Sequence, residues 1–221
     1  MYREAIGVTR STAMSRGNSG SRGQEHMSWM PMTDMLASTL MITFLFIAVS
    51  TILRAMNAKP PVIKLEDTKE YRFGTGSFLL SQNFKSSLRE NALPQIENTI
   101  KCYGIDTVEI IGHTDGRPGG GSSNIDNKIE KAVLKNDISS LIAGSNVDLG
   151  FLRALSVKNE IEKELKAVNL EKVRFRVLSA GSTLSPDGSF KPGKVLDEKS
   201  RRRIEIRFLR VNQQNFIPRC A

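Results

Sequence analysis

Apolar positions are concentrated in one uninterrupted stretch near the N-terminus. From Met35 onward this stretch consists of apolar or small residues, none of them charged, until it ends at Arg54. A helix of about 25 residues is long enough to cross a hydrocarbon core of roughly 30 Å. The pattern therefore predicts a transmembrane helix over residues 28–54.

Asp34 is the single acidic residue of that stretch. A carboxylate in a membrane-spanning helix costs about 2.5–3.5 kcal/mol at the centre and less toward an end. Two interpretations are open: Asp34 marks the interfacial edge as an N-cap after Pro31, or it carries an ion against a protein partner. On the opposite face, Thr39, Thr43 and Ser50 would suit pairing with a second copy of the helix, although such hydroxyls also bond back to their own helix.

After residue 70 the pattern changes to shorter amphipathic and alternating segments, which predict an α+β domain. The apolar run over 107–112 suits a strand covered by helices. The predicted helices are 86–103, broken at Pro94, then 124–142, and 149–168 with Asp148 as its N-cap; the predicted strands are 70–73, 107–112, 173–179 and 204–211.

Composition divides the chain into five segments. Residues 1–27 are rich in Ser, Gly, Arg and Met and predict a disordered tail rather than a cleavable signal, because the apolar run begins too late and is too long. Residues 55–70, stiffened by Pro60 and Pro61, predict a short linker. A domain over 71–212 with an insertion at about 116–145 follows, and then a tail over 213–221. The insertion opens with a glycine-rich loop that lacks the lysine of a phosphate-binding loop.

The remaining totals exclude several kinds of site. The 221 residues carry a net charge of +9, but the basic residues are dispersed except over 199–203, and 6% aromatic content is too little for base stacking. No direct nucleic-acid binding is expected. Two histidines and two cysteines without metal-ligand spacing predict no enzyme, metal site or cofactor. In an oxidising compartment Cys102 and Cys220 would form a disulfide; two free buried thiols are the alternative.

Three separated motifs occur in order: IIGHTD at 110–115, NVDLGFLRALSV at 146–157 and RRRIEI at 201–206. Together they resemble the OmpA-like peptidoglycan-binding domain, which implies a mixed sheet with helices packed on one face. The resemblance implies Asp115 and Arg153 as the principal wall ligands, with Asn146 beside them and Arg202 and Arg203 as the late arginines. A carboxylate and a guanidinium could hold the amino and carboxylate ends of a zwitterionic diaminopimelate group.

The chain also departs from that family. Gly150 stands in place of the usual serine, and Arg201 in place of asparagine. Asp115 and Arg153 are more than twice as far apart in sequence as is usual, because of the insertion. The insertion could loop outward, cover the pocket, or serve a new contact, since long surface loops cost little.

The membrane segment carries a second resemblance. Its W-x-x-x-x-D-M pattern at 29–35, followed by an OmpA-like domain, resembles the MotB family of ion-driven motor stators, which includes the ZorB subunits of Zorya anti-phage systems. The resemblance implies that Asp34 binds the transported ion, a proton or else sodium. It also implies a homodimer surrounded by a MotA/ZorA-like multi-span channel subunit, five copies to two.

This family further implies an inner-membrane protein with a cytoplasmic N-terminus and a periplasmic domain that binds peptidoglycan. Charge alone does not fix this orientation, because basic residues lie on both sides of the helix. The short linker favours a ZorB-like component over a flagellar stator subunit. A non-motile envelope tether is the alternative from a different class.

Overall fold

The computed structural model describes residues 22–56, 59–194 and 197–212. The chain divides into two units, Met1–Leu53 and Arg54–Ala221. In the first, helix α1 spans Arg22–Met56, so it begins six residues before the predicted start. The predicted disordered tail is therefore wrong for residues 22–27, where Gln24 and Glu25 are good helix formers and no proline intervenes. Residues 1–21 lie outside the described residues.

Helix α1 contains the stretch Met32–Leu53, which is long and apolar enough to cross a membrane by length and composition. The hydroxyl of Thr39 donates a hydrogen bond to the Leu36 carbonyl (2.9 Å), and that of Thr43 donates to the Leu40 carbonyl (2.8 Å). These threonines thus satisfy their hydroxyls within their own helix. Pairing of this face with a second copy stays a prediction.

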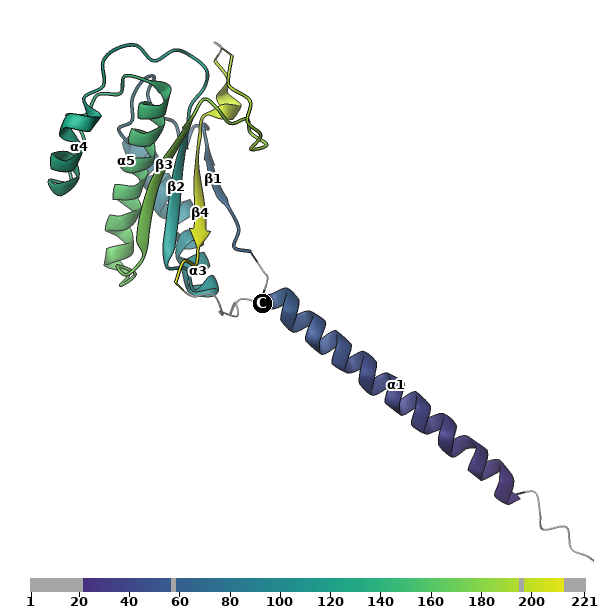
Figure 1. Cartoon of the computed structure of the whole chain (residues 1–221). Coiled ribbons are helices and arrows are strands. Elements are labelled where there is room, and N and C mark those ends of the chain that lie inside the picture. Colours follow the sequence, from purple (N-terminus) through teal and green to yellow (C-terminus); the bar gives the residue numbers. More distant parts are fainter. Residues whose placement is uncertain (1–21, 57–58, 195–196, 213–221) are drawn as a thin grey trace, which may run out of the picture. The chain divides into compact units, whose positions relative to one another are not determined.

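The second unit is built on a four-stranded mixed sheet (Figure 1). Its order is β1-β4-β2-β3; β4 pairs antiparallel with both β1 and β2, whereas β2 and β3 are parallel. The predicted mixed sheet is confirmed. The strands are β1 (Ile63–Glu66), β2 (Thr107–His113), β3 (Arg174–Gly181) and β4 (Arg203–Leu209).

Strand β1 corrects two predictions. It lies within the predicted linker, whereas the predicted strand at 70–73 is irregular. The alternation of Ile63 and Leu65 brings both side chains to the core while the intervening lysine stays exposed. Tyr71 and Phe73 also reach the core, but from a loop. The folded domain therefore begins at about residue 63 and not at 71.

The predicted break at Pro94 is confirmed as a π-helical turn. Helix α2 (Gln82–Ser87) continues through the π-turn Leu88–Ala92 into α3 (Leu93–Tyr103). The Leu93 N–H donates to the Leu88 carbonyl, five residues back, which gives the chain an extra residue just before the proline. The proline then occupies the first turn of α3, where its missing N–H costs nothing.

Helix α5 (Asn146–Ala167) begins earlier than predicted because its N-cap is Ser145 and not Asp148. The Ser145 hydroxyl accepts from the Asp148 N–H (3.1 Å), and the Asp148 carboxylate accepts from the Gly144 N–H (3.0 Å). The arrangement is similar to a capping box, except that the acid accepts from the N–H of the residue before the cap; the cap lies three residues before the acid.

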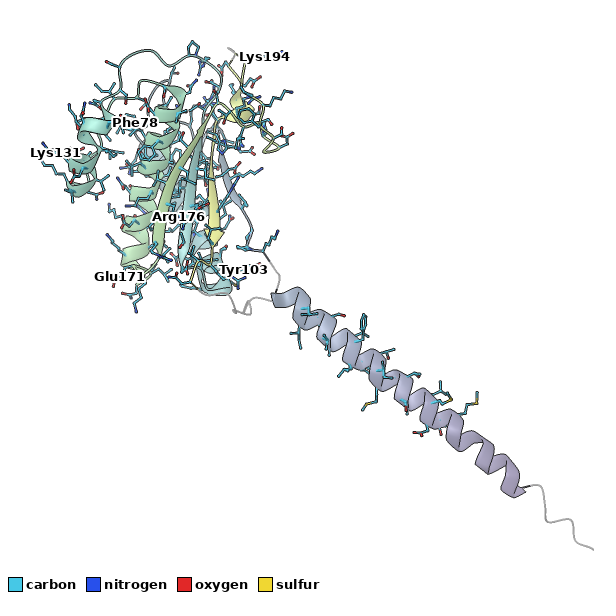
Figure 2. The ribbon with its side chains drawn as sticks, viewed as in Figure 1. Phe78, Tyr103, Lys131, Glu171, Arg176 and Lys194 are labelled. Atoms are coloured by element: carbon cyan, nitrogen blue, oxygen red, sulfur yellow. The ribbon has the colours of Figure 1, made fainter. Side chains whose placement is uncertain are left out.

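The insertion forms a small second core on the outer side of α5. Helix α4 (Ile125–Leu134) is shorter than predicted, and Asn136 in the left-handed conformation (φ 52°) follows its end. Buried Ala132 of α4 packs in one cluster with Phe78 and with Leu152 of α5. Figure 1 shows α4 outside α5, and Phe78 lies near both helices in Figure 2. The body of the insertion therefore packs outward, away from the main core between α5, α3 and the sheet.

Candidate functional site

One end of the sheet gathers the residues of the predicted site. Strands β1 and β2 end there, β4 begins there, and α5 starts against β2. A Cβ on Gly112 would lie 1.8 Å from the Gly150 carbonyl oxygen, so the two backbones touch where only glycine fits. The glycine at 150, a departure from the family, therefore seats α5 closely on β2. This contact carries Arg153, one turn further along α5, toward the end of β2.

Arg153 is a buried cation held by carbonyl oxygens. Its side chain is 5% exposed; Nε donates to the Ser77 carbonyl (2.9 Å) and Nη2 to the Gly74 carbonyl (3.3 Å). The guanidinium carbon lies 4.8 Å from the ring centroid of Phe73. Burial lowers the pKa of Arg153 to about 10, and the nearby charge of Arg202 acts in the same direction. The group is still charged at neutral pH, and no ion pair of Arg153 is found among the described residues.

Asp115 lies two residues beyond the end of β2 and is also 5% exposed. Its Oδ2 atom accepts from Arg117 Nε (2.9 Å) and from Arg202 Nη1 (2.7 Å). Both bonds go to the same oxygen, so Oδ1 takes part in neither. The carboxylate is thus buried and flanked by two guanidinium groups.

Arg202 joins three acids from three parts of the chain. Besides Asp115, it donates to Asp67 just after β1 (2.6 Å) and to Asp197 in the loop before β4. Burial alone would lower the pKa of Arg202, but hydrogen bonds to Asp197, Asp115 and Asp67 outweigh it and raise the pKa above its ordinary value. This arginine therefore fixes the ends of β1, β2 and β4 relative to one another.

A pocket of about 200 Å³ opens beside these groups. Cationic side chains outnumber acidic ones on its walls, because five arginines and lysines face two aspartates. The helix α5 N-terminus adds further positive potential at this end of the sheet. The geometry suits a ligand with at least one anionic group. The lining residues are Asp67, Arg72, Phe73, Gly74, Thr75, Arg117, Arg153, Asp197, Lys199 and Arg202.

The structure thus brings Asp115, Arg153 and Arg202 together at one end of the sheet. The other two predicted residues have internal partners: Asn146 donates to the Arg117 carbonyl (2.7 Å), and Arg203 donates to Glu205 (2.8 Å) and to the Ser185 carbonyl (3.1 Å). Both position their neighbours and are absent from the walls of the 200 Å³ pocket.

The predicted disulfide is tested only at one end. Cys102 is disulfide-bonded, whereas Cys220 lies outside the described residues. Their pairing stays a prediction.

The comparisons with known proteins are distant. No protein-family model and no curated protein matches the sequence. Among solved structures, the chain is similar to a MotB-like protein from Desulfovibrio vulgaris, with 16% identity, a TM-score of 0.39, and coverage of 67% of this chain and 74% of the other. It is also similar to the cell wall anchor of the T6SS from Pseudomonas aeruginosa, with 18% identity, a TM-score of 0.39, and coverage of 67% and 81%. At such distances the function has to be argued from the residues of the chain itself.

Three residues of the site were not among the predicted ones. Asp67 lay in the predicted linker, and Asp197 lay in a turn-rich loop. Arg117 follows GHTDG directly, so its nearness to Asp115 could have been read from the sequence, but its side-chain direction could not. Asp67 joins the site through a contact across the sheet end, whereas Asp197 and Arg117 join it through side-chain contacts with residues near them in sequence.

His113, the last residue of β2, is buried beside this cluster. Neither ring nitrogen has a hydrogen-bond partner among the described residues, and Nε2 lies 3.5 Å from Glu205 Oε1. The ring borders a cavity of about 20 Å³, the size of one water molecule. Burial lowers the pKa of His113 to about 4, and the charge of Arg203 acts in the same direction. The imidazole is therefore neutral at physiological pH.

No group of three or more His, Cys, Asp or Glu side chains able to hold a metal ion occurs within residues 22–56, 59–194 and 197–212.

Proposed function

We propose that this chain is the peptidoglycan-anchoring, ion-conducting subunit of a membrane motor complex, of the ZorB-like type found in anti-phage systems. The soluble domain would hold the diaminopimelate group of the cell wall. The membrane helix would pair with a second copy and carry an ion on Asp34 against a multi-span channel subunit. In this proposal the domain lies in the periplasm and the N-terminus lies in the cytoplasm.

One observation supports the proposed binding of the cell wall. Arg153 is a buried guanidinium without a carboxylate partner in the described residues, and it lies at the wall of the cationic pocket, close to the buried carboxylate of Asp115. Arg153 still has donors to offer after its two carbonyl bonds, and a ligand carboxylate would supply the missing counter-charge. Asp115 supplies the negative charge for a ligand ammonium. A zwitterion such as diaminopimelate matches this pair of opposite charges.

The test of wall binding is sedimentation of the full-length protein, in mild detergent, with purified diaminopimelate-type peptidoglycan. Asp115→Asn and Arg153→Lys should each lower the bound fraction at least tenfold, because asparagine carries no charge and lysine cannot form the planar fork. The matched control is Arg176→Ala, which removes an exposed arginine of β3 paired with Glu109. Binding by both site variants at the level of the control would refute this half of the proposal, provided that their melting temperatures show that they are folded.

The motor half is supported by Asp34, the one charged residue in the stretch Met32–Leu53 of α1. The end of α1 at Met56 is followed by β1 at Ile63, so only residues 57–62 connect the two elements. A connection of six residues has no room for an additional plug helix, which favours a ZorB-like subunit over a flagellar stator. Moving one charge through 100 mV is worth about 2.3 kcal/mol, comparable to the cost of a carboxylate in the membrane, so the field can drive a protonation cycle.

Substitution of Asp34 distinguishes an ion-conducting motor subunit from a non-motile envelope tether. Co-expressed with its neighbouring channel subunit and reconstituted in vesicles with a pH-sensitive dye, the complex should conduct protons, and Asp34→Asn should abolish conduction without loss of co-purification. Thr51→Val is the control and should conduct, because Thr51 lies on neither the Asp34 face nor the pairing face and its hydroxyl donates to the Ala48 carbonyl of its own helix (2.8 Å). An Asp34→Asn complex that conducts normally, or the lack of any co-purifying multi-span protein, would favour a non-motile envelope tether.

A further inference from the structure

Arg117 lies between the pocket and Asp115. Asp115 is absent from the walls of the 200 Å³ pocket, whereas Arg117 and Arg202, the two groups that donate to its carboxylate, are both on those walls. The acid that should attract a ligand ammonium is therefore covered by cations of the protein itself. A cationic ligand group cannot reach the carboxylate until one of them moves.

The two arginines differ in how firmly they are held. Arg202 bonds to Asp67, Asp115 and Asp197 and its side chain is mostly buried, so moving it would break three ion pairs. The side chain of Arg117 is 41% exposed, and among the described residues its guanidinium donates a hydrogen bond to Asp115 and lies farther, at 3.8 Å, from Asp197. Arg117 is therefore the group that a ligand can displace.

The backbone of Arg117 is fixed, so that only its side chain has to move. Its carbonyl accepts from Asn146 Nδ2 (2.7 Å) at the start of α5. The preceding Gly116 packs so closely that a Cβ there would lie 1.8 Å from the Lys194 carbonyl oxygen. The displacement is thus a change of rotamer and not the opening of a loop.

A second acid is available for the displaced guanidinium. Arg117 Nη1 already lies 3.8 Å from Asp197 Oδ2, and the Asp197 side chain is 53% exposed. A rotation that breaks the bond to Asp115 can strengthen the contact with Asp197. The Asp115 carboxylate keeps a cationic partner, because the ligand ammonium takes the place of the Arg117 guanidinium.

From this geometry we infer that Arg117 occupies the ammonium subsite of the pocket as an internal competitor, and that an amine-bearing ligand binds by displacing its guanidinium from Asp115 toward Asp197. The inference rests on the proposed wall-binding function and adds a residue that sets its affinity and specificity. A ligand with a carboxylate but no amine cannot replace Arg117; such a ligand gains from Arg117 as one more cation on the pocket wall.

The loss of Arg117 should change the affinities for a ligand with amines and a ligand without amines in opposite directions. Binding of meso-diaminopimelate and of pimelate, the same dicarboxylate without amines, is measured by calorimetry on the full-length protein and its Arg117→Ala variant. Removing a partly exposed ion pair that competes with the ligand should strengthen diaminopimelate binding up to about fivefold. The same substitution should weaken pimelate binding by a similar factor, because one attractive cation is lost.

The control is Arg176→Ala, an arginine of similar exposure on β3 that is paired with Glu109 and lies outside the pocket (Figure 2). It should change neither affinity. If Arg117→Ala weakens both ligands, Arg117 is a binding residue and the inference is overturned; an unchanged diaminopimelate affinity overturns it as well.

These outcomes are separable from those of the proposed function. A wild-type protein that binds diaminopimelate while Asp115→Asn does not supports wall binding whatever Arg117→Ala does. If neither the wild type nor Arg117→Ala binds diaminopimelate, the proposed function itself is wrong and the inference falls with it.

Discussion

Two buried charges are the basis of the proposed ligand binding. Arg153 and Asp115 are equally buried, yet each is satisfied differently: the guanidinium by carbonyl oxygens, the carboxylate by guanidinium groups. Burying a cation that has no carboxylate partner among the described residues is costly, and under the proposed function a ligand carboxylate supplies the counter-charge. This asymmetry is the chemical basis of the proposed ligand class.

His113 makes a prediction at the same scale. With a folded-state pKa of about 4 against 6.5 in the unfolded chain, the unfolded state binds more protons between these values. Stability contributed by the neutral imidazole is present above about pH 6.5 and is lost as pH falls toward 4. Over the whole window this lowers the free energy of unfolding by at most about 3 kcal/mol, which corresponds to several degrees in the melting temperature.

Thermal unfolding at pH 7.5 and 4.5 measures this effect. The wild type should lose several degrees more than His113→Gln, which cannot titrate. Glu205, a neighbour of the ring, has a lowered pKa because the hydrogen bonds that it accepts from Arg207 and Arg203 outweigh its burial. It is present in both proteins, so the difference between them reports His113. Equal losses in the two proteins would contradict the assignment.

At the scale of elements, the position of α5 on β2 is set by two glycines. The close contact between Gly112 and Gly150 leaves no volume for a side chain, and the hydroxyl of Ser179 on β3 donates to the Val147 carbonyl (2.7 Å) at the start of the same helix. The helix is thereby fixed to both parallel strands at the pocket end. A shift of α5 here would move Arg153 directly.

Gly112→Ala should therefore lower the free energy of unfolding by about 1–3 kcal/mol, as expected for overpacking, and should weaken peptidoglycan binding in the molecules that remain folded. Gly120→Ala is the matched control, because its Cβ would meet nothing within 4 Å. Urea unfolding of both variants measures the difference. A Gly112→Ala protein as stable as the control would mean that α5 can shift without cost.

The elements that were predicted correctly are those with strong local signals. Strand β2 is a continuous apolar run, and Pro94 marks the helix break by its own chemistry. Strand β1 was missed because its four residues follow two prolines and alternate with charged residues, and only pairing with β4 makes them a strand. The sequence placed Asp115 and Arg153 by motif, but the ion pair between Asp67 and Arg202 spans 135 positions, which no local pattern can reveal.

At the scale of the whole molecule, the two units divide the proposed work. The first carries Asp34 within an apolar helix, and the second carries the pocket at one end of its sheet. The insertion adds a small core on the outer side of α5 and sends only its first residues, including Arg117, to the pocket. The rest of the insertion thus forms a separate surface that contains none of the residues lining the 200 Å³ pocket.

The edge position of β1 has a mechanical consequence. The chain enters this strand at Ile63 and reaches the pocket end of the sheet at Asp67, where Arg202 clamps it. A pull between the N-terminal side of the domain and a ligand in the pocket runs along the strands, so the four paired positions of β1 and β4 are loaded in parallel and not unzipped one by one. Rupture then requires several antiparallel hydrogen bonds and an ion pair to fail together, and the rate of forced unfolding, more than equilibrium stability, would set how long the anchor bears a load.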